Sequence, residues 1–200
     1  MNMSFIKYVE GRLGIDVLLI TCGLPGTFKT ETSEEIAKLK GYPIVRTDIV
    51  RKEVLKGEDI FDEKVASNMD KRLLVYEETF READELIEKE DSVIIDATFI
   101  NQSLRRQAAA IANKYGKTFV ILKTNCPEEV SIARIIKRTK ENYESNALDE
   151  KAYLNNKNKF EEVDLDDLKT IYPSLNIVLL TVDTSKDLPE DWNIIGEIKR

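Results

Sequence analysis

The sequence has no histidine among its 200 residues and only two cysteines. Without histidine, Ser-His-Asp and Cys-His catalytic arrangements and His-based metal sites are excluded, so a general base must be a carboxylate, Lys, Tyr or Cys. Cys22 and Cys126 stand far apart and form no CxxC pair. We therefore expect two reduced thiols, and neither a disulfide framework nor a zinc site.

Long apolar runs and a basic excess are also missing. No segment approaches about 18 continuous apolar residues, and the N-terminus lacks an apolar signal core, so no membrane partner and a cytoplasmic location are expected. The formal net charge of −7 argues against undirected binding to nucleic acid or membrane surfaces, but leaves room for an enzyme with a small basic cleft. An apolar fraction of 42% with few Pro and Gly is typical of a globular chain, here one domain over residues 1–200.

Residues 16–30, DVLLITCGLPGTFKT, form the most informative stretch of the chain. A short apolar run enters a turn with Gly23, Pro25 and Gly26, and a polar helical pattern follows. The P-loop pattern is Gly, four residues, Gly, Lys, then Ser or Thr. Gly23, Lys29 and Thr30 match it, whereas Phe28 stands where the second Gly is usual.

A strand, loop and helix of this kind can bind phosphate. The loop supplies backbone N–H groups, and the helix after it adds the positive end of its dipole. Lys29 is expected to reach the β- and γ-phosphates, and the Thr30 hydroxyl to ligate Mg²⁺. The predicted cofactor-binding loop is Gly23, Leu24, Pro25, Gly26, Thr27, Phe28, Lys29 and Thr30. The alternative is a turn that uses Gly and Pro without binding anything.

Phe28 is the departure from the pattern that matters most. A glycine there lets the backbone approach a phosphate closely. The Phe side chain can point outward, stack on a base or narrow the pocket, and these alternatives stay open. One expected consequence of a Phe at this position is weak or unusual nucleotide binding.

Five apolar, β-rich segments alternate with helical patterns, which is typical of an α/β fold with a five-stranded parallel sheet and helices on both faces. The predicted strands are residues 16–22, 43–47, 92–97, 118–123 and 176–182. The predicted helices are residues 29–39, 49–55, 63–90, 102–115, 127–138 and 151–162. A short helix before residue 15 and a closing helix or extension after residue 187 complete the chain. Residues 139–162 are expected to form a helical lid.

Two carboxylates stand where predicted strands end. Asp48 follows the second strand and Asp96 ends the third. Parallel strands end at one edge of a sheet, so both side chains are expected near the loop. Asp48 is also a plausible helix N-cap, and Asp96 could simply bond backbone amides.

The order of these motifs resembles the P-loop kinases of the zeta-toxin, polynucleotide-kinase and gluconate-kinase type, including the small "AAA domain" kinases. The resemblance covers nearly the whole chain. Its segments are GLPGTFKT, RTDIVRKEV (46–54), VIIDATF (93–99), TNCPEEVSIARIIKR (124–138), a segment with Asn146 in place of an Asp, and TVDTS (181–185).

The resemblance implies an ATP- and Mg²⁺-dependent phosphotransferase with an alcohol as acceptor, and it implies a role for each matched residue. Asp48 is implied as the general base, with Lys29 and Arg138 as catalytic cations. Arg134 joins the nucleotide-binding residues. Arg51 is implied to help hold the acceptor or its anionic group, and Asp96 and Arg105 or Arg106 to contact the acceptor. Thr30 and Asp96 are the implied Mg²⁺ ligands. Alternatively, Arg134 and Arg138 form a solvated face with Glu128 and Glu129, and Arg51 is a surface charge.

Two other functions stay open. Phe28 and Asn146 favour a nucleotide-binding protein with lost or altered turnover. A kinase for 5′-hydroxyl ends of nucleic acid is disfavoured by the net charge of −7, unless a local basic groove offsets it. The candidate groove residues are Arg105, Arg106, Lys137, Arg138 and Lys140. The sequence identifies neither the acceptor nor the oligomeric state.

Overall fold

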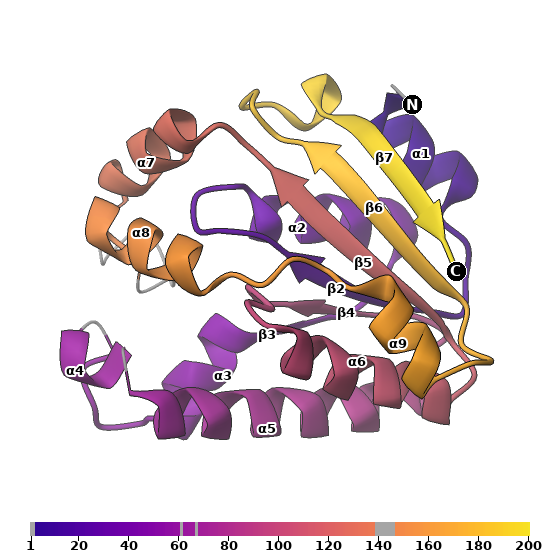
Figure 1. The fold of residues 1–200 in the computed structure, drawn as a ribbon, viewed down its shortest axis with the longest axis horizontal. Helices are drawn as coiled ribbons and strands as arrows, with labels where there is room; N and C mark the ends of the chain where they lie inside the picture. The colour runs from indigo at the N-terminus through magenta and orange to yellow at the C-terminus, as the bar shows by residue number, and fades with distance from the viewer. Residues whose placement is uncertain (1–2, 61, 67, 139–146) are drawn as a thin grey trace.

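A single sheet runs through the centre of the computed structural model, which describes residues 3–60, 62–66, 68–138 and 147–200 (Figure 1). The strands of this described part are β1 (Met3–Ser4), β2 (Val17–Cys22), β3 (Ile44–Arg46), β4 (Val93–Asp96), β5 (Thr118–Asn125), β6 (Ile177–Asp183) and β7 (Asn193–Lys199). They lie in the order β1-β7-β6-β5-β2-β4-β3.

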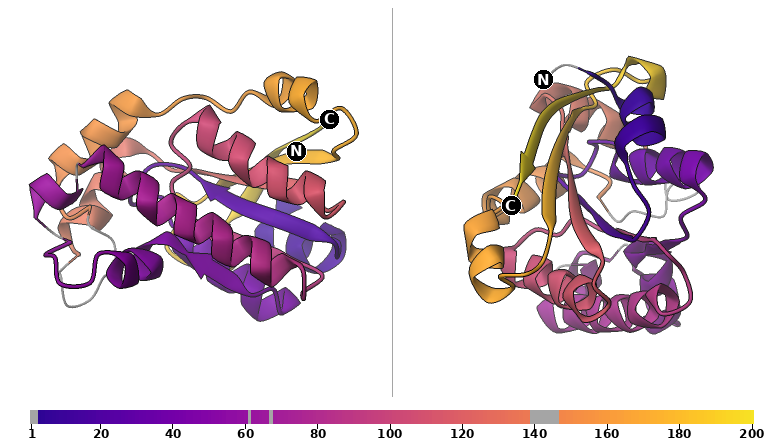
Figure 2. Two further views of the ribbon diagram at one scale, coloured as in Figure 1. Left: turned by 90° about the horizontal axis from the view of Figure 1, so that it is seen from below. Right: turned by 90° about the vertical axis from the view of Figure 1, so that its right-hand side faces the viewer.

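Helices precede, connect and flank these strands. They are α1 (Phe5–Arg12), α2 (Lys29–Lys40), α3 (Thr47–Val54), α4 (Glu63–Ala66), α5 (Met69–Ile87), α6 (Gln102–Lys114), α7 (Glu128–Ile136), α8 (Glu150–Lys159) and α9 (Leu165–Ile171). A short 3-10 helix, η1 (Pro189–Asp191), precedes β7. Figure 2 shows the sheet as a twisted layer with helices on both sides.

The predicted α/β class and its five parallel strands are confirmed. β3, β4, β2, β5 and β6 pair in parallel, and their bounds agree with the predicted ones to within about two residues. β7 pairs antiparallel with β6, and β1 pairs antiparallel with β7. Within the described residues the sheet thus has two strands beyond the predicted five. The C-terminal tail, predicted as a closing helix or extension, forms the extended strand β7.

The buried residues of β2 show why both faces are covered. Leu18 and Ile20 belong to the core under α5, α6 and α9, whereas Val17 and Leu19 belong to the core under α1 and α2. Because successive side chains of a strand point to opposite faces, a strand with no exposed residue needs a helical layer on each side. β2 lies between β4 and β5 at the centre of the sheet, so the loop that follows it opens at the carboxyl edge.

Two helical predictions need correction. The region predicted as one helix over residues 63–90 holds α4 and α5, and the Asn68 side chain accepts a hydrogen bond from Lys71 N as the N-cap of α5. Asp48 is not an N-cap: α3 begins at Thr47, its N-cap residue is Arg46, and no side chain caps it. Residues 139–146, including Asn146 and Lys140, lie outside the described residues, so the predicted lid is described from residue 147 onward. None of the described helices combines the length and apolar character that a membrane span requires.

Candidate active site

The loop between β2 and α2 uses its two glycines for close backbone approaches. Gly23 has a φ of 150° and Gly26 a φ of 78°. A Cβ atom on Gly26 would collide with the Ser131 carbonyl of α7, and one on Gly23 with the Thr124 side chain. Larger residues would push the loop away from α7 and β5, so the loop shape depends on both glycines.

Hydrogen bonds from three neighbouring segments hold the loop backbone. Thr27 Oγ1 donates to Leu24 O at 2.8 Å and lies 2.6 Å from Thr124 Oγ1. Thr184 Oγ1 donates to Thr27 O at 2.9 Å, and Gly23 N donates to Thr98 O at 3.3 Å. The loop is therefore fixed to the end of β5 and to the segments after β4 and β6.

Phe28 takes the left-handed backbone conformation, with φ 59° and ψ 38°, and is the N-cap residue of α2. This conformation costs a residue with a Cβ about 1–2 kcal/mol. The ring is held in place by its neighbours: its centroid lies 5.7 Å from that of Trp192 and 3.6 Å from Arg134 Cζ. Aromatic and cation–π contacts of this kind offset about 0.5–2 kcal/mol, so the loop keeps a glycine-like backbone despite the Phe.

Lys29, Thr30 and Asp96 meet at the start of α2. Lys29 Nζ donates to Leu24 O at 2.8 Å, and Thr30 Oγ1 donates to Asp96 Oδ2 at 2.7 Å. Burial lowers the pKa of Lys29, although the Asp96 charge opposes the shift. Burial likewise raises the pKa of Asp96, against the hydrogen bond from Thr30 and the charge of Lys29. The site holds opposite charges out of water and close together.

A cavity of about 730 Å³ extends from the loop to α3, α5 and α6. Its volume is in the range of small-molecule sites, about 300–1,000 Å³. Nine of the predicted site residues line it: Pro25, Gly26, Phe28, Lys29, Thr30, Asp48, Arg51, Asp96 and Arg138. The positive charge of Arg138 acts on Lys29 and Glu31. Gly23, Leu24 and Thr27 do not line the cavity but hold the loop that does.

Asp48 lies in the first turn of α3 and accepts a hydrogen bond from Arg51 Nη1, one turn further along the helix. Both side chains are largely buried, with exposed fractions of 25% and 13%. Arg51 is therefore not a surface charge. The pair forms part of the cavity wall.

Arg134 and Arg105 do not line the cavity in the described structure. Arg134 stacks on Phe28, and its Nη1 donates to Thr184 O at 2.9 Å and to Gly26 O at 3.4 Å. It braces the loop from outside instead of facing a phosphate. It pairs with Asp187, while Glu128, its alternative partner, pairs with Lys157.

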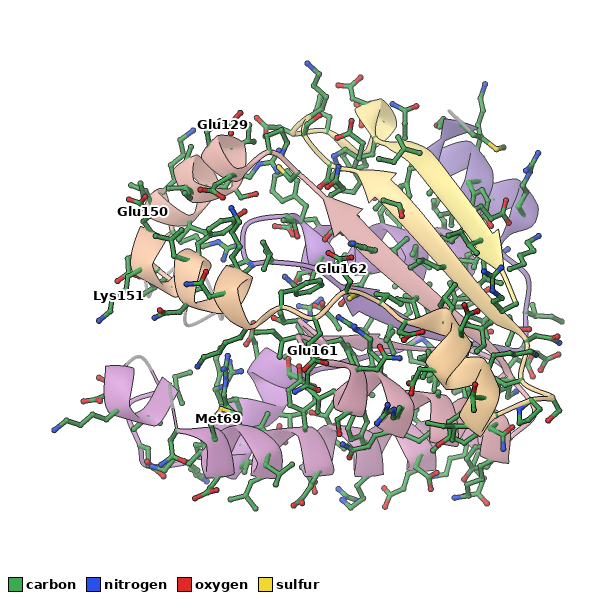
Figure 3. The ribbon with its side chains drawn as sticks, viewed as in Figure 1. Met69, Glu129, Glu150, Lys151, Glu161 and Glu162 are labelled. Carbon is green, nitrogen blue, oxygen red and sulfur yellow. The ribbon has the colours of Figure 1, made fainter. Side chains whose placement is uncertain are left out.

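Arg105 is completely buried in α6, so the structure does not support its predicted contact with the acceptor. Its guanidinium donates to the carbonyls of Phe99, Glu161 and Glu162, at 3.1, 2.5 and 2.9 Å. Figure 3 shows Glu161 and Glu162 on the segment that leaves α8 and crosses the molecule. Arg106 pairs with Asp167, so two members of the candidate basic groove are engaged within the protein.

Several cavity residues were not among the predicted site residues. Arg46 lies 3.5 Å from Asp96 and 2.9 Å from Glu34. Glu31, Arg72, Tyr76 and Asn101 also line the cavity. Arg72 and Tyr76 come from α5, whose sequence periodicity indicates only a packing helix. Tyr76 also packs in the core, with its ring centroid 5.8 Å from those of both Phe80 and Phe99.

Comparison with known families adds an independent finding. The AAA_33 family model, described as "AAA domain", matches residues 18–163, from β2 to the segment after α8. The chain belongs to this AAA domain family. The match includes the loop, Asp48, Asp96 and the described part of the predicted lid.

Relatives of this AAA domain chain are known at low identity. The uncharacterized proteins Rv2004c of Mycobacterium tuberculosis H37Rv and Mb2027c of Mycobacterium bovis are 29% identical over 136 residues. This alignment covers 65% of the chain and 27% of either relative, so the chain spans about a quarter of their length.

Solved structures share the fold. A gluconokinase from Sinorhizobium meliloti 1021 superposes with a TM-score of 0.58 at 19% identity, over 86% of this chain and 85% of that one. A sugar kinase from Janibacter sp. HTCC2649 gives 0.59 at 15% identity, over 87% of each chain. The AAA domain chain thus has the fold of P-loop kinases of the gluconate-kinase-like group.

The oxygens present suit Mg²⁺. Within the described residues, no three Asp, Glu, Cys or His side chains gather to hold a metal ion. Mg²⁺ in nucleotide sites usually takes one or two protein oxygens and completes its shell with phosphates and water. The Thr30 hydroxyl and the Asp96 carboxylate, already in contact at 2.7 Å, supply such a pair.

Proposed function

We propose that the chain is a Mg-ATP-dependent phosphotransferase that transfers the γ-phosphate to an alcohol. One observation supports this most strongly: a single cavity joins the phosphate loop, the Thr30–Asp96 pair and Asp48. Phosphoryl transfer needs chiefly positioning and charge stabilisation, and this cavity offers both.

The loop and α2 hold the triphosphate in this proposal. Backbone N–H groups and the helix dipole act on the phosphates, and Lys29 exchanges its bond to Leu24 O for phosphate oxygens. Thr30 and Asp96 hold Mg²⁺, which neutralises charge on the β- and γ-phosphates when bound. Arg138 also lines the cavity and adds positive charge near Lys29.

Asp48 acts on the acceptor in this proposal. Its carboxylate takes the proton of the acceptor hydroxyl as that oxygen bonds to phosphorus and the bond to the ADP oxygen breaks. Arg51 donates to the same carboxylate and orients it. A carboxylate is the simplest base in a chain with no histidine.

The test is ADP release from Mg-ATP across a panel of alcohols. We expect release that requires Mg²⁺, rises with at least one alcohol and is lost in Lys29→Met. Nucleotide binding without transfer to any alcohol would favour a nucleotide-binding protein that has lost turnover. Absence of both binding and release would reject the proposal.

A further inference from the structure

Charge in the cavity differs in sign from that of the chain. The whole chain carries a formal charge of −7, yet six basic and four acidic residues line the cavity. The basic ones are Lys29, Arg46, Arg51, Lys52, Arg72 and Arg138, and the acidic ones are Glu31, Glu34, Asp48 and Asp96. Part of this excess faces the loop, where a triphosphate would bind. The remainder lies at the other end, against α3 and α5.

We call that other part the acceptor end and define it by Asp48, Arg51, Arg72, Tyr76 and Asn101. Met69 at the start of α5, labelled in Figure 3, and Leu73 one turn later line the same side and are 60% and 49% exposed. The acceptor end thus combines charged and polar groups with apolar surface, which suits a small organic molecule.

Arg72 is the member whose charge the protein leaves uncompensated. It is half-buried, and within the described residues its guanidinium has neither a carboxylate partner nor a hydrogen bond. Burial lowers its pKa, and the nearby positive charge of Arg51 acts in the same direction. A guanidinium in this position is stabilised by an anion that enters the cavity.

Arg51 supplies further donors beside Arg72. Its Nη1 donates to Asp48, which leaves the other N–H groups of the guanidinium fork for a ligand. Asp48 offsets one of the two guanidinium charges. Arg51 and Arg72 together with Asp48 therefore leave one positive charge for a ligand to match.

Tyr76 and Asn101 add neutral donors. Tyr76 Oη accepts a hydrogen bond from Phe99 N at 3.2 Å, and burial raises the pKa of its hydroxyl to about 12, so Tyr76 keeps a proton to donate. Asn101 Oδ1 accepts from Leu104 N at 3.0 Å as the N-cap of α6, which leaves its amide N–H groups as donors. Apart from Asp48, the side chains of the acceptor end are thus arranged to donate.

We propose that the acceptor is an alcohol that already carries an anionic oxyacid group, a phosphate or a carboxylate, bound by Arg72 and Arg51. Tyr76 and Asn101 donate to the same ligand, and its hydroxyl lies against Asp48. This inference rests on the proposed function and narrows its acceptor class. A neutral polyol needs acceptors as well as donors and would leave the Arg72 charge unmatched.

The first test needs no catalysis and uses inorganic phosphate as its probe. Phosphate can bind at the loop through Lys29 and at the acceptor end through Arg72, so Lys29→Met isolates the second site. We expect phosphate to raise the melting temperature of Lys29→Met and of Lys29→Met/Arg81→Met, but not of Lys29→Met/Arg72→Met. Arg81 is the matched control because it lies on the same helix and pairs at the surface with Glu78 and Glu85.

If phosphate changes the melting temperatures of the three variants equally, there is no anion site at Arg72. This conclusion holds whether or not the chain transfers phosphate. Arg72→Lys provides a second variant should Arg72→Met fail to fold. It keeps the charge but loses the planar donor fork, so phosphate affinity should fall about tenfold. Unchanged affinity in Arg72→Lys contradicts bidentate binding by Arg72.

The second test compares glycerol, glycerol 3-phosphate and glycerate as acceptors in ADP release. We expect the KM of at least one anionic compound to be about 10- to 100-fold below that of glycerol. Arg72→Met should remove this preference and leave the KM for Mg-ATP unchanged, whereas Arg81→Met should change neither. The better of the two anions identifies the oxyacid.

If glycerol and the two anionic compounds have the same KM, and Arg72→Met changes none of these values, the inference of an anionic acceptor is wrong. The proposed kinase activity is not affected by this outcome. No ADP release with any acceptor rejects the kinase, and the phosphate titration then decides the anion site alone.

Discussion

The two ends of the cavity differ in how the protein compensates their charges. At the loop end, Lys29 bonds to Leu24 O, Thr30 bonds to Asp96, and Asp96 also lies 3.5 Å from Arg46. At the acceptor end, Asp48 satisfies Arg51, but Arg72 has no acid among the described residues. The loop end is complete before any ligand binds, and the acceptor end is not.

This difference indicates which end carries specificity. A preorganised loop suits a phosphate chain, which many P-loop proteins bind in the same way. The half-buried guanidinium of Arg72, without an acid partner among the described residues, discriminates more strongly, because ligands that fail to match its charge leave it unsatisfied. Substitutions at the two ends should therefore have separable effects on nucleotide and acceptor.

Asp48→Asn should have the largest effect on transfer. The amide cannot take the proton of the acceptor hydroxyl, so kcat should fall by about 10²–10⁴-fold while the affinity for Mg-ATP stays the same. Steady-state ADP release with a nucleotide titration measures both. Glu53→Gln, exposed on the same helix, is the control. If Asp48→Asn reduced the affinity for Mg-ATP as strongly as it reduced kcat, the two ends of the cavity would not have separate effects on nucleotide and acceptor.

Arg105→Met tests how much an arginine whose guanidinium is bonded within the protein contributes to stability. Its guanidinium donates to three backbone carbonyls and lies 5.2 Å from the Phe160 ring centroid, so its loss leaves buried acceptors unpaired. The free energy of unfolding should fall by about 3 kcal/mol. Denaturant unfolding measures this, with exposed Arg106→Met as control. A fully stable Arg105→Met variant with lost acceptor binding would restore the role first predicted for Arg105.

Asp96→Asn should raise the stability of the fold by an amount that depends on pH, and it should weaken nucleotide binding. Burial raises the pKa of Asp96 above its ordinary 3.8, so the folded chain binds this proton more tightly than the unfolded chain does. The associated stability is present at low pH and is lost as pH rises through the folded pKa. Because Asn stays neutral, the melting temperature of Asp96→Asn should gain on that of the wild type as the pH rises above the ordinary Asp pKa of 3.8.

Nucleotide binding supplies the other half of this prediction. Without the Asp96 carboxylate, Mg²⁺-dependent nucleotide affinity should fall about tenfold or more. Melting curves and titrations across pH check both halves, with the exposed Asp91→Asn as control. A stability difference that does not change with pH would contradict the charge-burial account.

Phe28→Gly should have the smallest effect. Glycine relieves the left-handed strain but loses the contacts with Trp192 and Arg134. These two effects are of similar size, so the free energy of unfolding should change by no more than about 1 kcal/mol. The affinity for Mg-ATP should change by less than about tenfold, because the loop keeps its backbone donors. Thermal melts and nucleotide titration measure this, and Phe28→Leu separates the aromatic contact from the strain. A 100-fold change in affinity, about 2.7 kcal/mol, would show that the ring acts on the nucleotide.

Local patterns predicted most of the fold. The apolar runs identified the five parallel strands. β1 and β7 were not predicted, because they pair with each other from opposite ends of the chain. The periodicity of apolar residues within one segment gives no information about such a distant partner. The break between α4 and α5 was missed because the apolar spacing continues across it.

The sequence predicted those parts of the candidate site whose residues lie together in one segment of the chain. The loop residues and Asp96 follow directly from strand ends. Arg105 and Arg72 both looked like charges on helices, and their environments distinguish them: Arg105 meets carbonyls about 56 residues away, and Arg72 meets an open cavity. Such partners depend on the tertiary fold, so spacing in the sequence could not separate the two arginines.

The most direct test of the account is a calorimetric titration of the chain with Mg-ATP. A loop that holds a triphosphate with Phe28 in place predicts saturable binding, with a Kd between about 1 μM and 1 mM, that requires Mg²⁺. Lys29→Met should weaken this binding by about 100-fold or more while the protein stays folded. No binding at about 10 mM nucleotide, or equal binding by Lys29→Met, would contradict a nucleotide site at this loop.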